Sequence, residues 1–456
     1  MGRRALLRSR ARIDRFKLAS RTHVRERLMD DDVIADAVRR HADENRTPQH
    51  DAWRRVDGYI REIVPFFNVV AYYQIGYRAA GWLLHLFYKT SVTFEDERGR
   101  ERLPRDAVLI YVMNHRSNAD YILVSYALAG HVAISYAVGE WARAFPLELV
   151  FKAFGSYFIR RRYREPLYHA VLERYVQLIT REGVTQGIFV EGGLTRDGKL
   201  RAPKVGLLDY VLGIGRDPAF AARLHVVPVA VNYDRVLEDR SLLRELDATA
   251  GGRRPPRRTQ AWEVGRYVGW NIARLLSRRW KRYGRAAVVV GAPIPLAPWF
   301  ASHTELFTLE KPERLGLVQA LCDTLLESVG RLIPVTPVPL VCAAIQSFDS
   351  EFIARAALFA RIDEMRGVLS ELNARVFSGD NGAEEIFTRA WRMLKMRRVI
   401  AEDGAGFIVL PRGRPLVSYY ANSVAHLLGP FVAAVQARDA LPAMAGLRES
   451  VRNDFK

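Results

Sequence analysis

Between residues 91 and 300, short strand-like runs alternate with helical segments, and this alternation constrains the fold more than any other feature of the sequence. The runs are apolar and rich in β-branched or aromatic side chains, whereas the helical segments 166–181 and 262–282 are longer. Such a layout predicts an α/β fold with a mostly parallel central sheet flanked by helices. The strand-like runs are 108–113, 131–137, 155–159, 187–190, 226–231 and 286–290.

We expect this α/β region to be one of four parts. They are a basic, loosely ordered N-terminal arm at 1–58, amphipathic membrane-associating helices at 59–90, a catalytic domain at 91–300 and a mainly helical C-terminal domain at 301–456. The run 415–437 lacks charged residues and is long enough to span a bilayer, but its polar side chains and the Gly429-Pro430 pair favour a buried helix followed by a break.

Residues 59–90 are rich in Tyr, Phe and Trp, and Pro65, Arg78 and His85 interrupt their apolar run. A membrane-spanning helix needs about 20 predominantly apolar residues. We therefore expect two amphipathic helices that lie on a membrane surface, with basic side chains near the headgroups. A helical pair packed on the protein core explains the same pattern.

The chain is strongly basic, with 69 Lys and Arg against 50 Asp and Glu and a formal net charge of +19. Such a surface attracts nucleic acid, anionic lipid or phosphorylated substrates. The basic residues are scattered and form no recognisable nucleic-acid-binding motif, so we expect no nucleic-acid partner. Cys322 and Cys342 lie in apolar surroundings without metal-ligand spacing, which predicts a reducing compartment, no disulfide and no metal site.

The first strand-like run ends in the sequence NHRSNAD, residues 114–120. Ser117 is expected to cap the next helix, with Asp120 in a capping-box position. His115 then lies in the turn and can fold back toward Asp120. A carboxylate on one ring nitrogen orients the other nitrogen to take a proton from an alcohol. When this motif is taken alone, a helix cap beside an ordinary loop histidine is the favoured explanation.

A second motif, GSYFIRRRY at 155–163, places Arg160, Arg161 and Arg162 after a strand-like run. Guanidinium groups match phosphate geometry in a bidentate manner, so these arginines are candidate ligands of a phosphorylated substrate. A solvated basic turn is the alternative.

A third motif, FVEGGLTRDGK at 189–199, ends a strand-like run with Glu191. Gly192 and Gly193 permit close approach of a ligand to the backbone, and Thr195 and Arg196 supply donors. Taken alone, the segment could be an ordinary hairpin turn.

The fourth motif, VVPVAVNYDRVLE at 226–238, contains a proline that suits an edge strand or the start of a strand. Its apolar stretch, with Pro228 and Val229, could line an acyl-chain or donor site, where each buried methylene contributes roughly 0.8 kcal/mol. Core packing is equally plausible. All four motifs end predicted strands, and ligands gather outside the carboxyl ends of strands in open α/β sheets, so the motifs are expected to converge.

In this order and spacing the motifs resemble those of the glycerolipid acyltransferase family, in its glycerol-3-phosphate and dihydroxyacetone-phosphate acyltransferase branch. The matching segments are NHRSNADY at 114–121, Gly155 to Arg161, Phe189 to Arg196, Pro203 to Leu208 and Pro228 to Glu238. VSYYANSVAHLL at 417–428 resembles a C-terminal helix of the bacterial glycerol-3-phosphate enzymes. The resemblance is firm over roughly 105–300 and looser over 330–430.

The resemblance implies transfer of a fatty acyl group from acyl-CoA or acyl carrier protein to the sn-1 hydroxyl of glycerol 3-phosphate, without a cofactor or a metal. His115 would be the general base and Asp120 its orienting carboxylate. Backbone N–H groups near Ser117 and the two glycines would hold the oxyanion. The implied substrate-binding residues are Arg160, Arg161, Arg162, Glu191, Gly192, Gly193, Thr195, Arg196 and Lys204.

One position departs from the family pattern, because Leu194 stands where the family usually has arginine. This leaves dihydroxyacetone phosphate and lysophosphatidate as alternative acceptors. A non-catalytic protein that binds anionic membrane is the alternative of another class, although such a binder has no use for the His115–Asp120 pair. We expect a peripheral or monotopic protein at the cytoplasmic face of the cell membrane, in contact with anionic phospholipid.

Overall fold

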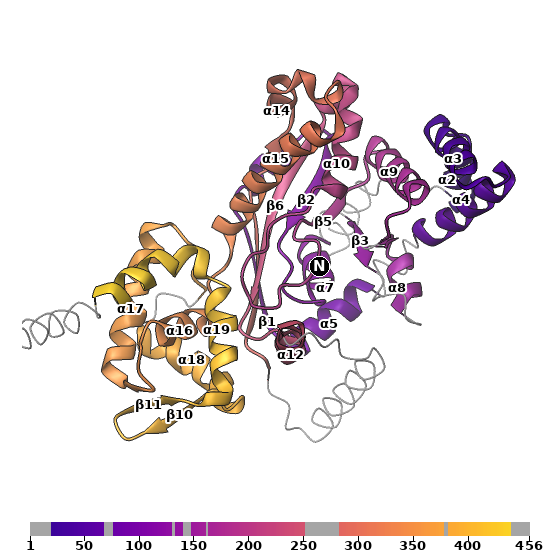
Figure 1. Cartoon of the computed structure of the whole chain (residues 1–456). Coiled ribbons are helices and arrows are strands. Elements are labelled where there is room, and N and C mark those ends of the chain that lie inside the picture. Colours follow the sequence, from indigo (N-terminus) through magenta and orange to yellow (C-terminus); the bar gives the residue numbers. More distant parts are fainter. Residues whose placement is uncertain are drawn as a thin grey trace, which may run out of the picture.

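A mostly parallel sheet forms the centre of the protein, and helices flank it as the sequence predicts (Figure 1). The computed structural model describes residues 20–67, 76–129, 133–139, 147–160, 163–250, 282–377 and 382–438. Along the main sheet the order is β1-β7-β6-β2-β5-β3-β4, with β8 also pairing with β6. Neighbours from β6 to β4 are parallel, as are β1 and β7, whereas β7 and β8 run antiparallel to β6.

The strands of this sheet agree with the predicted runs, apart from shifted ends and two additional strands, β1 and β8. They are β1 Lys89–Phe94, β2 Val108–Met113, β3 Ser135–Gly139, β4 Tyr157–Ile159, β5 Gln186–Phe189, β6 Leu224–Tyr233, β7 Arg285–Val290 and β8 Ile294–Pro295. Every residue of β2 is buried, because its alternate side chains enter two different cores: Tyr111 lies in one and Ile110 in the other. This explains why β2 is a continuous apolar run.

Helices cover both faces of the sheet. The core that contains Ile110 also includes residues of α9 Pro166–Arg181, α10 Gly206–Leu212 and α15 Lys311–Leu332. The core that contains Tyr111 includes residues of α5 Tyr77–Phe87 and α7 Asp120–Leu128. The other helices of this region are α6 Glu97–Glu101, α8 Leu147–Ala153, α11 Pro218–Ala221, α12 Asp239–Ala250 and α14 Ala297–Ser302, and 3-10 turns lie at Gly213–Arg216, Thr304–Phe307 and Pro411–Gly413.

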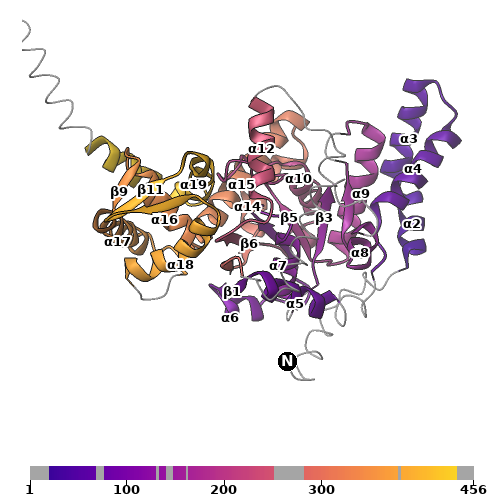
Figure 2. The same ribbon diagram turned by 90° about the horizontal axis from the view of Figure 1, so that it is seen from below.

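The N-terminal region is a folded helical bundle, which corrects the prediction of a loosely ordered arm over 1–58. Helices α2 Arg21–Met29, α3 Asp32–Asn45 and α4 Gln49–Ile63 lie beside α9 (Figures 1 and 2). Helix α3 buries Ile34, Val38 and Ala42 at helical spacing, so its charged residues occupy only its outer face. The expected boundary at residue 58 falls inside α4, whose last turn buries Ile60 and Ile63. Residues 1–19 lie outside the described ranges.

The C-terminal region forms a separate lobe on the side opposite the N-terminal bundle (Figures 1 and 2). It contains α16 Pro337–Gln346, α17 Arg355–Glu371, α18 Ala383–Met396, α19 Arg414–Asn422 and a small antiparallel sheet of β9 Phe352–Ala354, β10 Ile400–Asp403 and β11 Gly406–Val409. Helix α15 packs on β6 and β2, because residues such as Val318 and Leu325 complete the core of the main sheet. The lobe therefore begins after α15 rather than at residue 301.

Two further expectations need correction. Pro228 lies inside the central strand β6, not at an edge; it sits where the antiparallel partner of β6 changes from β8 to β7, so its missing N–H falls at a break in that ladder. The run 415–437 breaks at residues 423–424 rather than at Gly429-Pro430. Among the described residues, no helix has both the length and the apolarity needed to cross a membrane. Most of the predicted helix 262–282 lies outside those residues.

Candidate active site

His115 and Asp120 form a buried hydrogen-bonded pair in the loop between β2 and α7. The His115 Nδ1 atom lies 2.9 Å from Asp120 Oδ2, and both side chains are at most 1% exposed. A carboxylate accepts, so Nδ1 carries the proton and the tautomer places the basic lone pair on Nε2. The imidazole stacks on Phe189 with ring centroids 4.0 Å apart. Orientation and tautomer of the ring are thus fixed together.

Further donors fix the Asp120 carboxylate. Its Oδ2 atom also accepts from the backbone N–H groups of Arg116 (2.7 Å) and Ser117 (3.0 Å), and its Oδ1 atom accepts from the Tyr233 hydroxyl at 2.6 Å. Burial, and the nearby Asp120 charge, raise the pKa of Tyr233 well above its ordinary value, so the phenol remains a donor. Helix α7 begins at Asp120, later than predicted, and the Ser117-to-Asp120 bond is the part of the capping box that is present.

Glu191 braces the loop that carries His115. It follows β5, which pairs with β2 so that Phe189 lies opposite Met113. One carboxylate oxygen accepts from the His115 N–H (2.8 Å) and the other from the Arg201 N–H (2.9 Å). Burial raises the pKa of Glu191, and the Arg116 guanidinium opposes that rise. The side chain is 1% exposed, so this carboxylate supports the loop rather than presenting itself to a ligand.

Glu238, after β6, holds the next turn of the same loop. It accepts from the Ser117 hydroxyl at 2.7 Å and from the Asn118 N–H at 3.2 Å. The backbone N–H groups of Ser117, Asn118 and Gly192 are therefore all engaged within the protein, the last of them with the Phe189 carbonyl. This differs from the expected oxyanion-binding role of the Ser117 and Gly192 amides.

Arg160 is paired with the N-terminal bundle. Its Nε and Nη2 atoms lie 2.8 and 2.5 Å from the two carboxylate oxygens of Glu62 on α4. The guanidinium also lies 4.7 Å from the centre of the Tyr163 ring. The ion pair raises the pKa of Arg160 above its ordinary value. The guanidinium of Arg160 is thus already paired with a carboxylate of the protein. Arg161 and Arg162 lie outside the described residues.

The remaining predicted residues are divided between loop structure and surface. Thr195 is buried; its hydroxyl bonds within its own loop and its backbone N–H donates to the His115 carbonyl at 3.2 Å. Arg196 pairs with Glu245 at 3.1 Å, and Lys204 is exposed. Gly192 adopts a φ of +66°, and a Cβ there would lie 2.8 Å from Lys204 Cγ. Gly193 is buried in the same loop, and Pro228 and Val229 are buried in β6, where Val229 is part of the core.

Sequence reasoning missed several residues that hold the site together: Asn114, Arg116, Arg201, Tyr233 and Glu238. Asn114 is an example with a recognisable signal, since a polar amide ends a wholly apolar strand. Its side chain pairs with the backbone of Val231 through both its amide nitrogen (3.0 Å) and its oxygen (2.8 Å). In the described ranges, no three His, Cys, Asp or Glu side chains gather in a way that could hold a metal ion.

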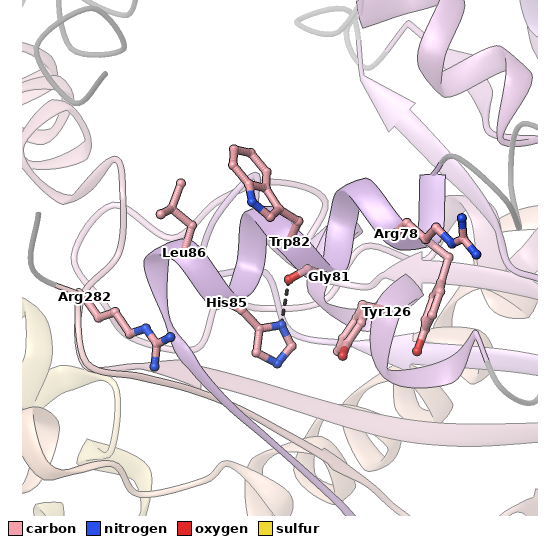
Figure 3. A pocket seen from close by; sticks show the side chains of 8 residues that line it. Arg78, Gly81, Trp82, His85, Leu86, Tyr126 and Arg282 are labelled. Atoms are coloured by element: carbon pink, nitrogen blue, oxygen red, sulfur yellow. Dashed lines mark hydrogen bonds between the residues drawn. The ribbon is translucent and has the colours of Figure 1, made fainter. Parts of the chain in front are cut away.

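A hollow of about 530 Å³ lies on the surface between α5 and α7 (Figure 3). Trp82 projects from α5 and is 65% exposed. Arg78 and Arg282 lie at opposite ends of the hollow. His85 donates a hydrogen bond to the Gly81 carbonyl at 2.6 Å, and Tyr126 of α7 also lines the hollow. The hollow therefore combines an aromatic surface with two cationic ends.

Comparisons with known sequences agree with this geometry. The family described as Acyltransferase matches residues 96–232, and the family described as glycerol-3-phosphate acyltransferase C-terminal region matches residues 270–435. Both matches are to acyltransferase families, and the second is to a region named for glycerol-3-phosphate acyltransferases.

Glycerol-3-phosphate acyltransferases from two bacteria are among the relatives of this chain. The Aeromonas hydrophila protein is 27% identical over 90% of this chain and 50% of its own length, and the Xanthomonas campestris protein is 28% identical over 90% and 46%. The chain thus spans about half the length of these relatives. The crystal structure of a 1-acyl-sn-glycerophosphate acyltransferase from Thermotoga maritima is a distant neighbour, with a TM-score of 0.30 and 20% identity over 56% of this chain and 76% of that one.

Proposed function

We propose that this acyltransferase moves a fatty acyl group from acyl-CoA or acyl carrier protein to the sn-1 hydroxyl of glycerol 3-phosphate. The observation that carries the proposal is the buried 2.9 Å contact between His115 and Asp120, inside the matched acyltransferase region. The names of the relatives support glycerol 3-phosphate as the acceptor.

In the proposed step His115 Nε2 removes the proton of the acceptor hydroxyl as its oxygen attacks the thioester carbonyl. The tetrahedral intermediate then expels the thiolate, the C–S bond breaks, and the imidazolium returns the proton to sulfur. Asp120 keeps the ring in the required tautomer and stabilises the imidazolium. General base catalysis of this kind contributes about 10²–10⁴-fold. Because the imidazole is 1% exposed, the acceptor reaches Nε2 only after surrounding groups move.

Leu194 bears on the choice of acceptor. Its backbone carbonyl accepts from Arg201 Nη1 at 3.2 Å, so a guanidinium lies beside the position where the family usually has arginine. We propose that Arg201 supplies the phosphate contact that the Leu194 side chain cannot.

The test is turnover of the purified protein with labelled glycerol 3-phosphate, dihydroxyacetone phosphate and lysophosphatidate, each with acyl-CoA and with acyl carrier protein. We expect glycerol 3-phosphate to be acylated at sn-1, and Arg201→Gln to raise its KM with little change in kcat. Turnover of lysophosphatidate alone would overturn the acceptor assignment, and no turnover of any acceptor would overturn the proposed activity.

We also propose that the surface around α5 contacts anionic phospholipid at the cytoplasmic face of the cell membrane. The exposed Trp82, the arginines at the two ends of the hollow and the net charge of +19 support this contact. Cosedimentation with phosphatidylglycerol vesicles is expected to weaken in Trp82→Ala and at high salt. Leu372→Ala is the control, because Leu372 is 53% exposed in the C-terminal lobe. Equal binding by both variants would contradict the proposal.

A further inference from the structure

Arg116 connects the catalytic pair to two other segments of the chain. Its backbone N–H donates to the Asp120 oxygen that also receives His115 Nδ1. Its side chain is 1% exposed and extends to the third motif and the C-terminal lobe, where Nη1 donates to the Gly198 carbonyl and Nη2 to the Ser423 carbonyl at 3.0 Å. Arg116 thus bonds to the Asp120 carboxylate through its backbone, and to the third motif and the C-terminal lobe through its side chain.

Ser423 is the C-cap of α19, where helix carbonyls lack intrahelical partners and carry partial negative charge. A guanidinium supplies such a carbonyl with a hydrogen-bond donor and with a positive charge that complements its partial negative charge. Two more bonds hold this helix end in place: Asn422 Nδ2 donates to the Asp197 carbonyl at 2.9 Å, and Asn232 Nδ2 lies 3.3 Å from Ser423 Oγ. The end of α19 therefore has a fixed position against the catalytic loop.

We infer that Arg116 is a positioning residue through which helix α19 of the C-terminal lobe sets the geometry of the His115–Asp120 pair. The inference deepens the proposed acyl transfer and rests on it where activity is measured. Loss of the guanidinium leaves two buried carbonyls without their donor and frees the loop at the residue whose N–H holds Asp120. Displacement of the pair follows, so a change far from the reacting atoms alters the chemical step.

The experiment compares Arg116→Gln and Arg116→Lys with Arg361→Gln in the full chain. Arg361 is a matched control, because its side chain is buried like that of Arg116 but lies in the C-terminal lobe. It donates to Ser347 Oγ at 2.7 Å and to Glu364 Oε2 at 2.8 Å. For Arg116→Gln we expect kcat to fall on the order of 10²-fold, as for a displaced catalytic group, with KM changed by less than about threefold. A lysine can donate to only one of the two carbonyls at a time, so we expect kcat of Arg116→Lys to be about tenfold higher than that of Arg116→Gln. Arg361→Gln lowers the melting temperature and leaves kcat unchanged.

A second measurement does not depend on turnover. Without substrate, the NMR signal of the His115 Nδ1 proton reports its bond to Asp120, and we expect it to shift and to exchange faster with solvent in Arg116→Gln but not in Arg361→Gln. If the wild-type protein acylates no acceptor, the proposed function fails while this readout still tests the positioning role. An unchanged signal, or an unchanged kcat in an active enzyme whose melting temperature falls, would overturn the inference.

Discussion

The loops after β2 and after β4 both carry polar residues at the carboxyl edge of one sheet, but their surroundings differ. After β2, His115 is joined to Asp120 and, through its backbone, to Glu191 after the neighbouring strand β5. After β4, Arg160 turns to Glu62 of the N-terminal bundle. The first loop is thus bonded to its neighbours in the site, and the second is bonded to a helix outside it.

Strand order explains the difference. β2 and β5 are adjacent, whereas β4 is the edge strand, three positions from β2. Neighbouring strands lie about 4.8 Å apart, so the loop after β4 starts roughly 14 Å from the loop after β2. Motifs that end neighbouring strands can bond to each other directly. A motif at the edge of the sheet can contact the loop after β2 only through long side chains or through a bound substrate. Five substitutions, in four experiments, test this contrast.

His115→Ala has the largest expected effect. Removal of the base should lower kcat at least by the 10²–10⁴-fold typical of general base catalysis. The fold should persist, because the His115 backbone bonds to Glu191 and Thr195 remain. Rates with glycerol 3-phosphate, circular dichroism and vesicle binding check this. Asn45→Ala, at the exposed end of α3, is a control that leaves the rate unchanged, and substantial residual turnover in His115→Ala would remove His115 as the base.

Gly198→Ala tests how tightly the third motif fits against α19. Gly198 has a φ of +87°, and a Cβ there would lie 1.9 Å from the Tyr419 carbonyl oxygen. Gly183 is a matched control, since its φ is +78° and a Cβ would meet nothing within 4 Å. Both variants strain the backbone, because alanine disfavours a positive φ. Only Gly198→Ala also creates a clash with α19, which pushes the third motif away from the C-terminal lobe. We expect it to lose about 1–3 kcal/mol more of the free energy of unfolding than Gly183→Ala, measured in urea, together with activity. Equal losses would show that the fit is loose.

Arg160→Gln and Glu62→Gln test the outer loop. If their ion pair is the main role of Arg160, both variants should lose similar stability, and a double-mutant cycle should give a coupling of about 0.2–1 kcal/mol, since the pair is partly exposed. KM for glycerol 3-phosphate should then change little in either variant. A KM raised tenfold by Arg160→Gln alone would instead support the phosphate contact expected from the sequence.

The sequence predicted the sheet well because buried strands need apolar, β-branched runs whatever surrounds them. It also predicted the pairing of His115 with Asp120, which requires only one turn of chain. The folded N-terminal bundle was harder to recognise, because the buried positions of α3 are separated by many charged residues. Glu62 and Ser423 gave no signal, because their partners Arg160 and Arg116 lie 98 and 307 residues away in the sequence.

The smallest expected effect belongs to Glu238→Gln, which tests whether the inner loop needs the charge of Glu238 or only its hydrogen bonds. Burial and the neighbouring Asp120 charge raise the pKa of Glu238 above its ordinary value of 4.5, against the hydrogen bond from Ser117. A carboxyl group with a higher pKa in the folded protein binds its proton more tightly there. The free energy of unfolding therefore falls as the pH rises from about 4.5 through the raised pKa.

An amide can keep both bonds, accepting from the Asn118 N–H and donating to the Ser117 hydroxyl. Relative to wild type, Glu238→Gln should therefore gain stability as the pH rises through this window, by at most about 1.4 kcal/mol for each pKa unit between the folded and unfolded states. Urea denaturation at the two ends of the window measures the gain, with Glu371→Gln, at the exposed end of α17, as the control for loss of one charge. A variant that loses stability with rising pH would show that the loop depends on the charge itself, as the ion pair of Arg160 does.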